Sequence, residues 1–138
     1  MNTVTPKDEE FLYEGHLIIS QLDMDGRIIF VNRNFCEVSG YDVDEIIGLE
    51  YKTILHPDMP SEIYSKMIKN LKSGQTSNEI IKNIRKDGLY YWTNLEIIAT
   101  KDEDNNITGF ISVSKHASKK DIQKNSELYE KMLKTQKS

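Results

Sequence analysis

The apolar residues of this chain follow a period of two in some stretches and a helical period in others. Two apolar, β-branched runs, 16–22 and 27–31, flank the polar turn residues 23–26, and this arrangement predicts a β-hairpin. Two short helices are predicted next, at 32–40 and 42–48, because each stretch begins with a polar capping residue and ends with glycine. The first part of the chain is therefore expected to form a hairpin followed by two short helices.

A longer amphipathic helix follows and is closed by the turn residues 72–74. Its apolar positions share one helical face: Ile63, Tyr64, Met67, Ile68 and Leu71. Three strands are predicted after it, at 77–84, 89–100 and 107–114. From residue 118 onward, lysine-rich sequence carries a nearly heptad-spaced apolar stripe, which is typical of a helix that packs on a partner.

This order of elements predicts an α+β fold, in which an antiparallel sheet is covered on one face by helices, with a further helix at each end. The 138 residues are enough for one hydrophobic core. We divide the chain into an N-terminal flanking cap at 1–15, a globular domain at 16–116 and a C-terminal linker helix at 117–138.

The long strand at 89–100 has two unlike faces. The set predicted to face the core is Tyr91, Thr93, Leu95, Ile97 and Ala99. Trp92 lies on the opposite face and is expected to pack under the N-terminal segment or a second subunit, because a bare tryptophan would be an exposed apolar patch. On the inner faces of the neighbouring strands, Asn83, Ser112 and Ser114 need hydrogen-bond partners, which a ligand, water or a loop can supply.

Residues 55–60, with the sequence LHPDMP, join the strand-rich first part to the long helix. Two prolines restrict the backbone here, and Pro60 occupies the first turn of the helix, where proline is tolerated. Asp58 can accept hydrogen bonds from the free N–H groups of that turn. The segment therefore holds His56 and Asp58 rigidly beside a helix end, either as a ligand contact or as a structural cap.

Charge and composition narrow the possible partners. The net charge of −4 and the pI near 5.4 argue against nucleic acid or an anionic membrane as the main partner. No apolar run approaches the roughly 20 residues of a membrane span, and Cys36 has no partner for an internal disulfide or a zinc site. We expect a cytoplasmic protein that binds small ligands or other proteins.

Catalytic motifs are missing from the sequence. It contains no glycine-rich phosphate loop, no histidine or cysteine cluster at metal-ligand spacing, and no serine in a nucleophile-elbow context. We therefore expect that the protein is not an enzyme and that it holds no metal directly.

Several short motifs identify a family resemblance. They are VNRNF at 31–35, VSGY at 38–41, IIG at 46–48, RKDG at 85–88, Trp92 and GFISV at 109–113. With these motifs in place, the chain resembles a PAS domain over about residues 16–116. The sequence HPDMP at 56–60, with 81–88 and Tyr91-Trp92, is similar to the aerotaxis-transducer type of PAS domain.

The resemblance implies a five-stranded antiparallel sheet in the order 2-1-5-4-3, curved around a ligand pocket. It also implies a sensor that binds FAD non-covalently and relays redox, oxygen or energy state to a chemotaxis transducer or signalling kinase module. The positions that match flavin-site residues of the family, or the pocket walls of its flavin-binding members more broadly, are Asn32, His56, Asp58, Asn83, Thr93, Leu95 and Ser114. A homodimer through the N-terminal segment and the outer sheet face is expected as well.

Two positions depart from the flavin-binding pattern. Leu55 stands where arginine usually precedes the HPD sequence, and Ser77 stands where tryptophan is usual in the third strand. Two other functions are therefore kept: a haem sensor with His56 as axial ligand, and a cofactor-free dimerisation module that uses the Trp92 face. Cys36 lies away from the position of the reactive cysteine in light-sensing relatives, so no photoadduct is expected.

Overall fold

The computed structural model describes residues 4–136. The elements along the chain are β1 (Ile18–Leu22), β2 (Ile28–Val31), α1 (Arg33–Ser39), α2 (Val43–Ile46), the 3-10 helix η1 (Tyr51–Ile54), α3 (Ser61–Lys72), β3 (Ser77–Ile84), β4 (Tyr90–Lys101), β5 (Ile107–His116) and α4 (Lys119–Gln136). Hydrophobic periodicity and, for α1 and α2, capping residues predicted all of these except η1, which has neither signal in the sequence.

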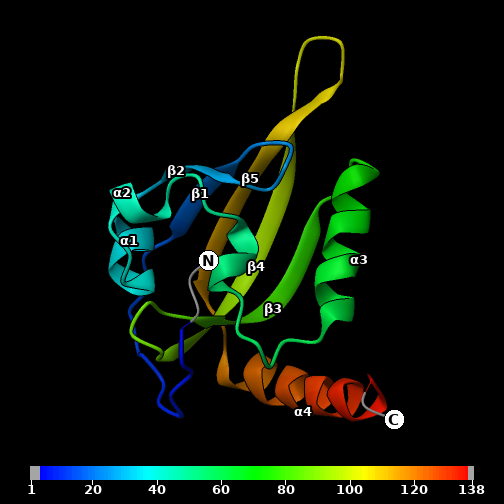
Figure 1. Cartoon of the computed structure of the whole chain (residues 1–138). Helices are drawn as coiled ribbons and strands as arrows, with labels where there is room; N and C mark the ends of the chain where they lie inside the picture. The colour runs from blue at the N-terminus through cyan, green and yellow to red at the C-terminus, as the bar shows by residue number, and fades with distance from the viewer. Residues whose placement is uncertain (1–3, 137–138) are drawn as a thin grey trace.

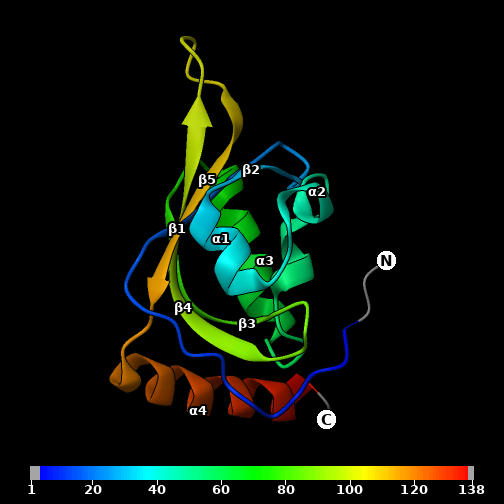
Figure 2. The ribbon, with the colours of Figure 1, turned by 90° about the vertical axis from the view of Figure 1, so that its left-hand side faces the viewer.

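The five strands form one antiparallel sheet in the order β2-β1-β5-β4-β3, which confirms the expected topology. Figure 2 shows α1, α2 and α3 on one face of the sheet and α4 along its lower end. The inner face of β4 carries Thr93, Leu95 and Ile97, each at most 2% exposed, so the predicted core face is confirmed. The main core therefore lies between this face and the three helices.

Capping residues fix the short helices that follow the hairpin. Asn32 caps α1, since its side-chain oxygen accepts a hydrogen bond from the Phe35 N–H, and Gly40 ends the helix in the left-handed conformation at φ 80°. Asp42 and Glu45 form a capping box at the start of α2. These local hydrogen bonds explain why the sequence alone located both helices.

Both outer strands of the sheet pair with neighbouring segments. Next to β3, Leu55 forms a β-bridge with Asn83, and the His56 N–H donates to the Lys82 carbonyl at 3.0 Å. Next to β2, the Ile28 N–H donates to the Leu49 carbonyl at 2.9 Å, and the Gly48 N–H donates to the Ile28 carbonyl at 2.8 Å. The loops around η1 thus cover part of each sheet edge.

The prediction of a helix before the first strand is wrong. Within the described part of this segment, residues 4–17 form no helix, and residues 4–14 (called the strap below) run along the β3–β4 turn. The Lys7 N–H donates to the Gly88 carbonyl at 2.9 Å, and the Phe11 N–H donates to the Tyr90 carbonyl at 2.7 Å. These non-local partners satisfy the backbone, so the segment does not need the hydrogen bonds of a helix.

The structure also corrects the expected neighbour of Trp92. Its ring stacks on Tyr129 of α4, with ring centroids 6.5 Å apart and an interplanar angle of 16°. The Tyr129 hydroxyl donates to the Ile80 carbonyl at 2.6 Å, which holds α4 against β3. Trp92 is only 7% exposed under this helix.

None of the helices within residues 4–136 combines the length and the apolar run that a membrane span requires.

Candidate functional site

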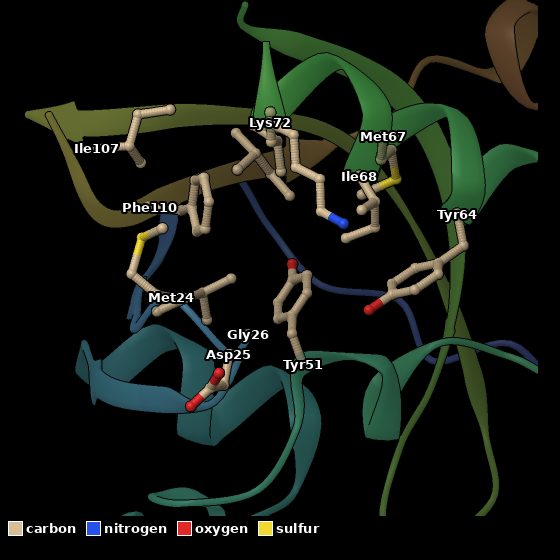
Figure 3. Close-up of a pocket in the computed structure, with 13 residues that line it drawn as sticks. Met24, Asp25, Gly26, Tyr51, Tyr64, Met67, Ile68, Lys72, Ile107 and Phe110 are labelled. Carbon is tan, nitrogen blue, oxygen red and sulfur yellow. The ribbon is translucent and has the colours of Figure 1, made fainter. Parts of the chain in front are cut away.

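A cavity of about 370 Å³ lies on the inner side of the sheet, between α3, the β1–β2 turn and the start of β5 (Figure 3). It is lined by Leu22, Met24, Asp25, Gly26, Tyr51, Tyr64, Met67, Ile68, Leu71, Lys72, Ile97, Ile107 and Phe110. Most of these side chains are apolar or aromatic, and the volume falls at the lower end of the range for small-molecule sites, about 300 to 1,000 Å³. The cavity therefore suits a small, largely apolar group.

Tyr51 of η1 lines this cavity, and Figure 3 shows its side chain extending toward the centre. It is 5% exposed, and its hydroxyl shares hydrogen bonds with Ser112 and Ser114, two serines that do not line the cavity. Burial raises the pKa of Tyr51, and the two serine hydrogen bonds act in the opposite direction. A neutral tyrosine side chain thus separates the cavity from a polar floor on β5, where Ser20 of β1 also hydrogen-bonds Ser112.

Two charged residues reach the mouth of the cavity. Figure 3 shows the Lys72 side chain extending from α3 toward Tyr51, whereas the Asp25 carboxylate points away from the centre. Neither side chain forms an ion pair with another described residue. On its α3 side, the cavity is therefore lined by one positive charge, that of Lys72, and otherwise largely by apolar side chains.

Asn32, one of the seven predicted site residues, lies outside the cavity lining and is fully engaged in the fold. Its Oδ1 accepts from the backbone N–H groups of Ile19 at 3.1 Å and Phe35 at 3.0 Å, and its Nδ2 donates to the Leu17 carbonyl at 2.9 Å. Its side chain therefore joins α1 to β1, which is a structural task.

His56 and Asp58 also lie outside the cavity lining. His56 is 5% exposed, and its Nδ1 accepts a hydrogen bond from the Asp58 N–H at 3.0 Å, while its ring meets Tyr90 edge-on at 6.4 Å. Burial, followed by the Lys82 cation, lowers the pKa of His56, and Asp58 opposes them. The Asp58 carboxylate is 65% exposed and pairs with Lys82 at 3.3 Å. Both residues thus stabilise the turn before α3.

The other four predicted residues do gather on the inner face of the sheet, although none lines the cavity. Asn83, Thr93, Leu95 and Ser114 are each at most 3% exposed. The Asn83 Oδ1 has no hydrogen-bond partner among the described residues, and neither has the Ser77 Oγ on the same face of β3. Buried polar atoms without partners are costly, and these two lie six residues apart on β3, so they mark two separate positions with unused hydrogen-bonding capacity. As ligand contacts, all seven residues stay predictions.

None of the residues that line the cavity was predicted as a site residue from the sequence. Tyr51 lies on η1, which is too short for a periodic pattern to show the direction of its side chain. Lys72 was assigned only to the turn residues 72–74 that close the helix. Tyr64 and Ile68 did carry a signal, because they flank the core stripe of Ile63 and Met67 by one position each. Apolar residues beside a core stripe, half-buried in the structure, are what a cavity wall on a helix requires.

Comparison with known proteins places this arrangement among sensors. The sequence pattern of the family described as "PAS domain" matches residues 15–116. The aerotaxis receptor of Escherichia coli (strain K12) is 31% identical over 118 residues, which are 86% of this chain and 23% of that receptor. A blue-light-activated histidine kinase of Brucella anthropi is 31% identical over 88 residues, 64% of this chain and 18% of that kinase. The chain thus spans less than a quarter of each of these two relatives.

Solved structures agree on the fold. A light-oxygen-voltage domain studied with a flavin analogue superposes with a TM-score of 0.72 at 25% identity, covering 80% of this chain and 86% of that domain. The light-state structure of the blue-light photoreceptor Aureochrome1 LOV superposes with a TM-score of 0.67 at 20% identity, over 88% of this chain and 91% of that one. The second likeness supports the fold alone.

Proposed function

Because this chain belongs to the PAS domain family, a family of sensor domains, we propose that it binds a flavin non-covalently, with FAD as the expected form. The observation that carries the proposal is the apolar cavity between α3 and the sheet. The similarity to an aerotaxis receptor and to a light-oxygen-voltage domain studied with a flavin analogue supports it. A bound flavin would supply a reversible redox centre.

The residues present fit the ring system of a flavin. The cavity takes one flat ring system rather than a whole dinucleotide, and its aromatic and aliphatic walls suit the apolar edge of such a ring. The unpartnered Ser77 Oγ, next to Ile97 of the cavity wall, and the unpartnered Asn83 Oδ1, at the other end of β3, supply hydrogen-bonding capacity on the inner face of the sheet. Tyr51 stands between these groups and the cavity wall on the η1 side, so its side chain is expected to adjust when the ring is bound.

We propose that the sheet passes the state of the cofactor to α4. Ile97 of β4 lines the cavity, while Trp92 of the same strand stacks on Tyr129 from the other face. A shift of β4 at the cavity would therefore change how α4 packs on the sheet through Trp92 and Tyr129. In this proposal α4 leads to a chemotaxis transducer or a histidine kinase module in the cytoplasm, and similarity to a receptor and a kinase supports that class of partner.

The haem alternative has less support from the site. His56 does not line the cavity, and its Nδ1 already accepts a hydrogen bond. A cofactor-free dimerisation module remains the second candidate, because Phe30 and Ile98 on the outer sheet face are 48% and 40% exposed. We propose a homodimer through this face and the strap as part of either function.

The absorbance spectrum of the purified protein, before and after incubation with FAD, tests the proposal. We expect paired flavin bands in the blue and near-ultraviolet. Ile68→Trp fills the cavity and is expected to abolish binding, because Ile68 lines it from α3. Ile98→Trp adds the same bulk on the outer face, where Ile98 is exposed, and is expected to retain the flavin.

Three outcomes would contradict the flavin proposal. A Soret band would identify haem instead. A protein that stays colourless with FAD, FMN and riboflavin alike would favour the cofactor-free module. Equal flavin binding by Ile68→Trp and Ile98→Trp would move the site away from the cavity.

A further inference from the structure

We propose that Tyr51 is a gate between the cavity and the polar inner face of the sheet, and that serines of β5 hold this gate closed. The inference rests on the proposed flavin function and adds to it the residue that decides how readily the ring system is bound. It starts from the predicted site residues on β4 and β5, which are buried beside the cavity without lining it.

The cavity and the predicted residues lie along one face of β4. Ile97 lines the cavity, whereas Leu95 and Thr93, the next two positions on that face, are each at most 1% exposed and do not line it. On β5, Ser112 lies opposite Ile97, and Ser114 lies opposite Leu95. The cavity lining on β4 therefore stops at Ile97, one row short of Leu95 and Ser114.

Tyr51 stands at this boundary. Its side chain lines the cavity and extends toward the centre (Figure 3), and its hydroxyl hydrogen-bonds Ser112 and Ser114, one serine from each row. Ser112 is in turn hydrogen-bonded by Ser20 of β1. The Ser114 hydroxyl, which the family pattern assigns to the ligand, is thus already engaged by Tyr51.

Opening of the gate is a rotation of the Tyr51 side chain. The backbone of η1 is tied to the β1–β2 turn, since the Tyr51 N–H donates to the Gly26 carbonyl at 2.9 Å and Glu50 forms a β-bridge with Arg27. The rotation breaks the hydrogen bonds to the serines and joins the cavity with the next row of the sheet. A ligand ring in the cavity then reaches the free hydroxyl of Ser114.

A closed gate lowers the apparent affinity for a flavin. When only a fraction of the molecules is open, the apparent dissociation constant is the intrinsic constant divided by that fraction. The hydrogen bonds of Tyr51 favour the closed state, so removal of its hydroxyl raises the open fraction. The other explanation is that these hydrogen bonds only stabilise the fold, and their loss would then leave the flavin affinity unchanged.

Equilibrium titration and stopped-flow binding of FAD to the full chain distinguish these explanations. Tyr51→Phe keeps the ring and removes the hydroxyl, and it is expected to bind FAD about tenfold more tightly than the wild type, the effect of two hydrogen bonds. The observed binding rate of the wild type is expected to level off with rising FAD concentration at the rate of gate opening, and this limit should rise in Tyr51→Phe. Ser112→Ala removes one partner of Tyr51 and is expected to tighten binding as well, with no further gain when it is combined with Tyr51→Phe.

Tyr129→Phe is the matched control. Tyr129 is also a buried tyrosine, its hydroxyl donates to the Ile80 carbonyl, and it does not line the cavity. This variant is expected to keep the FAD affinity and the rate limit of the wild type. Equal or weaker FAD binding by Tyr51→Phe, compared with a wild type that binds FAD, would overturn the gate while leaving the flavin function intact. Failure of the wild type, Tyr51→Phe and Ser112→Ala to bind FAD, FMN or riboflavin would overturn both.

Discussion

Single residues divide into those whose polar groups are used by the fold and those whose groups are not. All the hydrogen-bonding atoms of the Asn32 side chain are engaged by β1 and α1, while the Asn83 Oδ1 is buried without a partner among the described residues. Both asparagines match the family pattern equally well in sequence. Only their surroundings in the folded chain separate a structural asparagine from one that is available to a ligand.

Asn83→Ala is therefore expected to change mainly the flavin affinity, and Asn32→Ala only the free energy of unfolding. Asn83→Ala should weaken flavin binding about tenfold, the value of one hydrogen bond, and it also removes the side-chain hydrogen bond between Asn83 and Tyr91. Asn32→Ala should lower that free energy by about 1 kcal/mol through the lost cap and leave the affinity of the folded protein unchanged. Urea unfolding and flavin titration of both variants measure the two quantities. Unchanged affinity in Asn83→Ala would remove Asn83 from the site.

His56 makes stability depend on pH. Burial and the Lys82 cation hold the pKa of His56 below its ordinary value of 6.5, and protonation would also remove the acceptor of the Asp58 N–H. On acidification the unfolded chain takes up the proton first, so this contribution to stability is complete above about pH 6.5 and is lost as the pH falls toward the folded-state pKa. The free energy of unfolding should thus fall as the pH drops below about 6.5.

Urea unfolding across this pH range measures the effect. His56→Asn replaces the titrating acceptor by an amide oxygen and is expected to flatten the profile. His16→Asn, at an exposed position, is the matched control and should keep the wild-type slope. Equal slopes in wild type and His56→Asn would show that other groups set the pH dependence.

Among the elements, the strap depends on one glycine. A Cβ atom on Gly88 would lie 2.4 Å from the Thr5 carbonyl oxygen, and the φ of Gly88 is +95°. Gly48 has nearly the same φ, +92°, with nothing within 4 Å of its position for a Cβ. The two glycines therefore share the conformational cost of a side chain but differ in contact with the strap.

Gly88→Ala is expected to displace the strap, whereas Gly48→Ala should cost only the conformational strain of about 1 to 2 kcal/mol. Hydrogen exchange of the Lys7 and Phe11 amides measures the displacement, since these amides donate to the Gly88 and Tyr90 carbonyls. We expect them to lose protection in Gly88→Ala alone. Equal protection in both variants would mean that the strap tolerates the added methyl group.

Elements with a local cause were predictable and elements with a distant cause were not. The helices at Arg33–Ser39 and Val43–Ile46 are set by caps within a few residues, and the strands by alternation. The strap and η1 are set by partners far along the chain, such as the Gly88 and Gly26 carbonyls. The sequence within either segment contains no pattern that predicts those distant hydrogen-bond partners.

At the scale of the whole molecule, the family pattern predicted the sheet order, and the tertiary packing decided the candidate site. The inner faces of β3, β4 and β5 are polar where expected, yet η1 inserts Tyr51 between that surface and the cavity. The position of Tyr51 depends on how η1 packs, which a strand pattern does not contain. The sequence therefore located the wall of the interior but not the space beside it.

The covered sheet edges determine how copies of this chain can associate. Segments around η1 occupy backbone groups of Lys82 and Ile28 on the two outer strands. A row of free N–H and C=O groups on an outer strand is a template for another chain to add itself, the first step toward cross-β aggregates. Here that step would first require the η1 loops to detach. Self-association without unfolding is thereby directed to the faces of the sheet, and the chain is expected to resist fibril growth for as long as these loops stay in place.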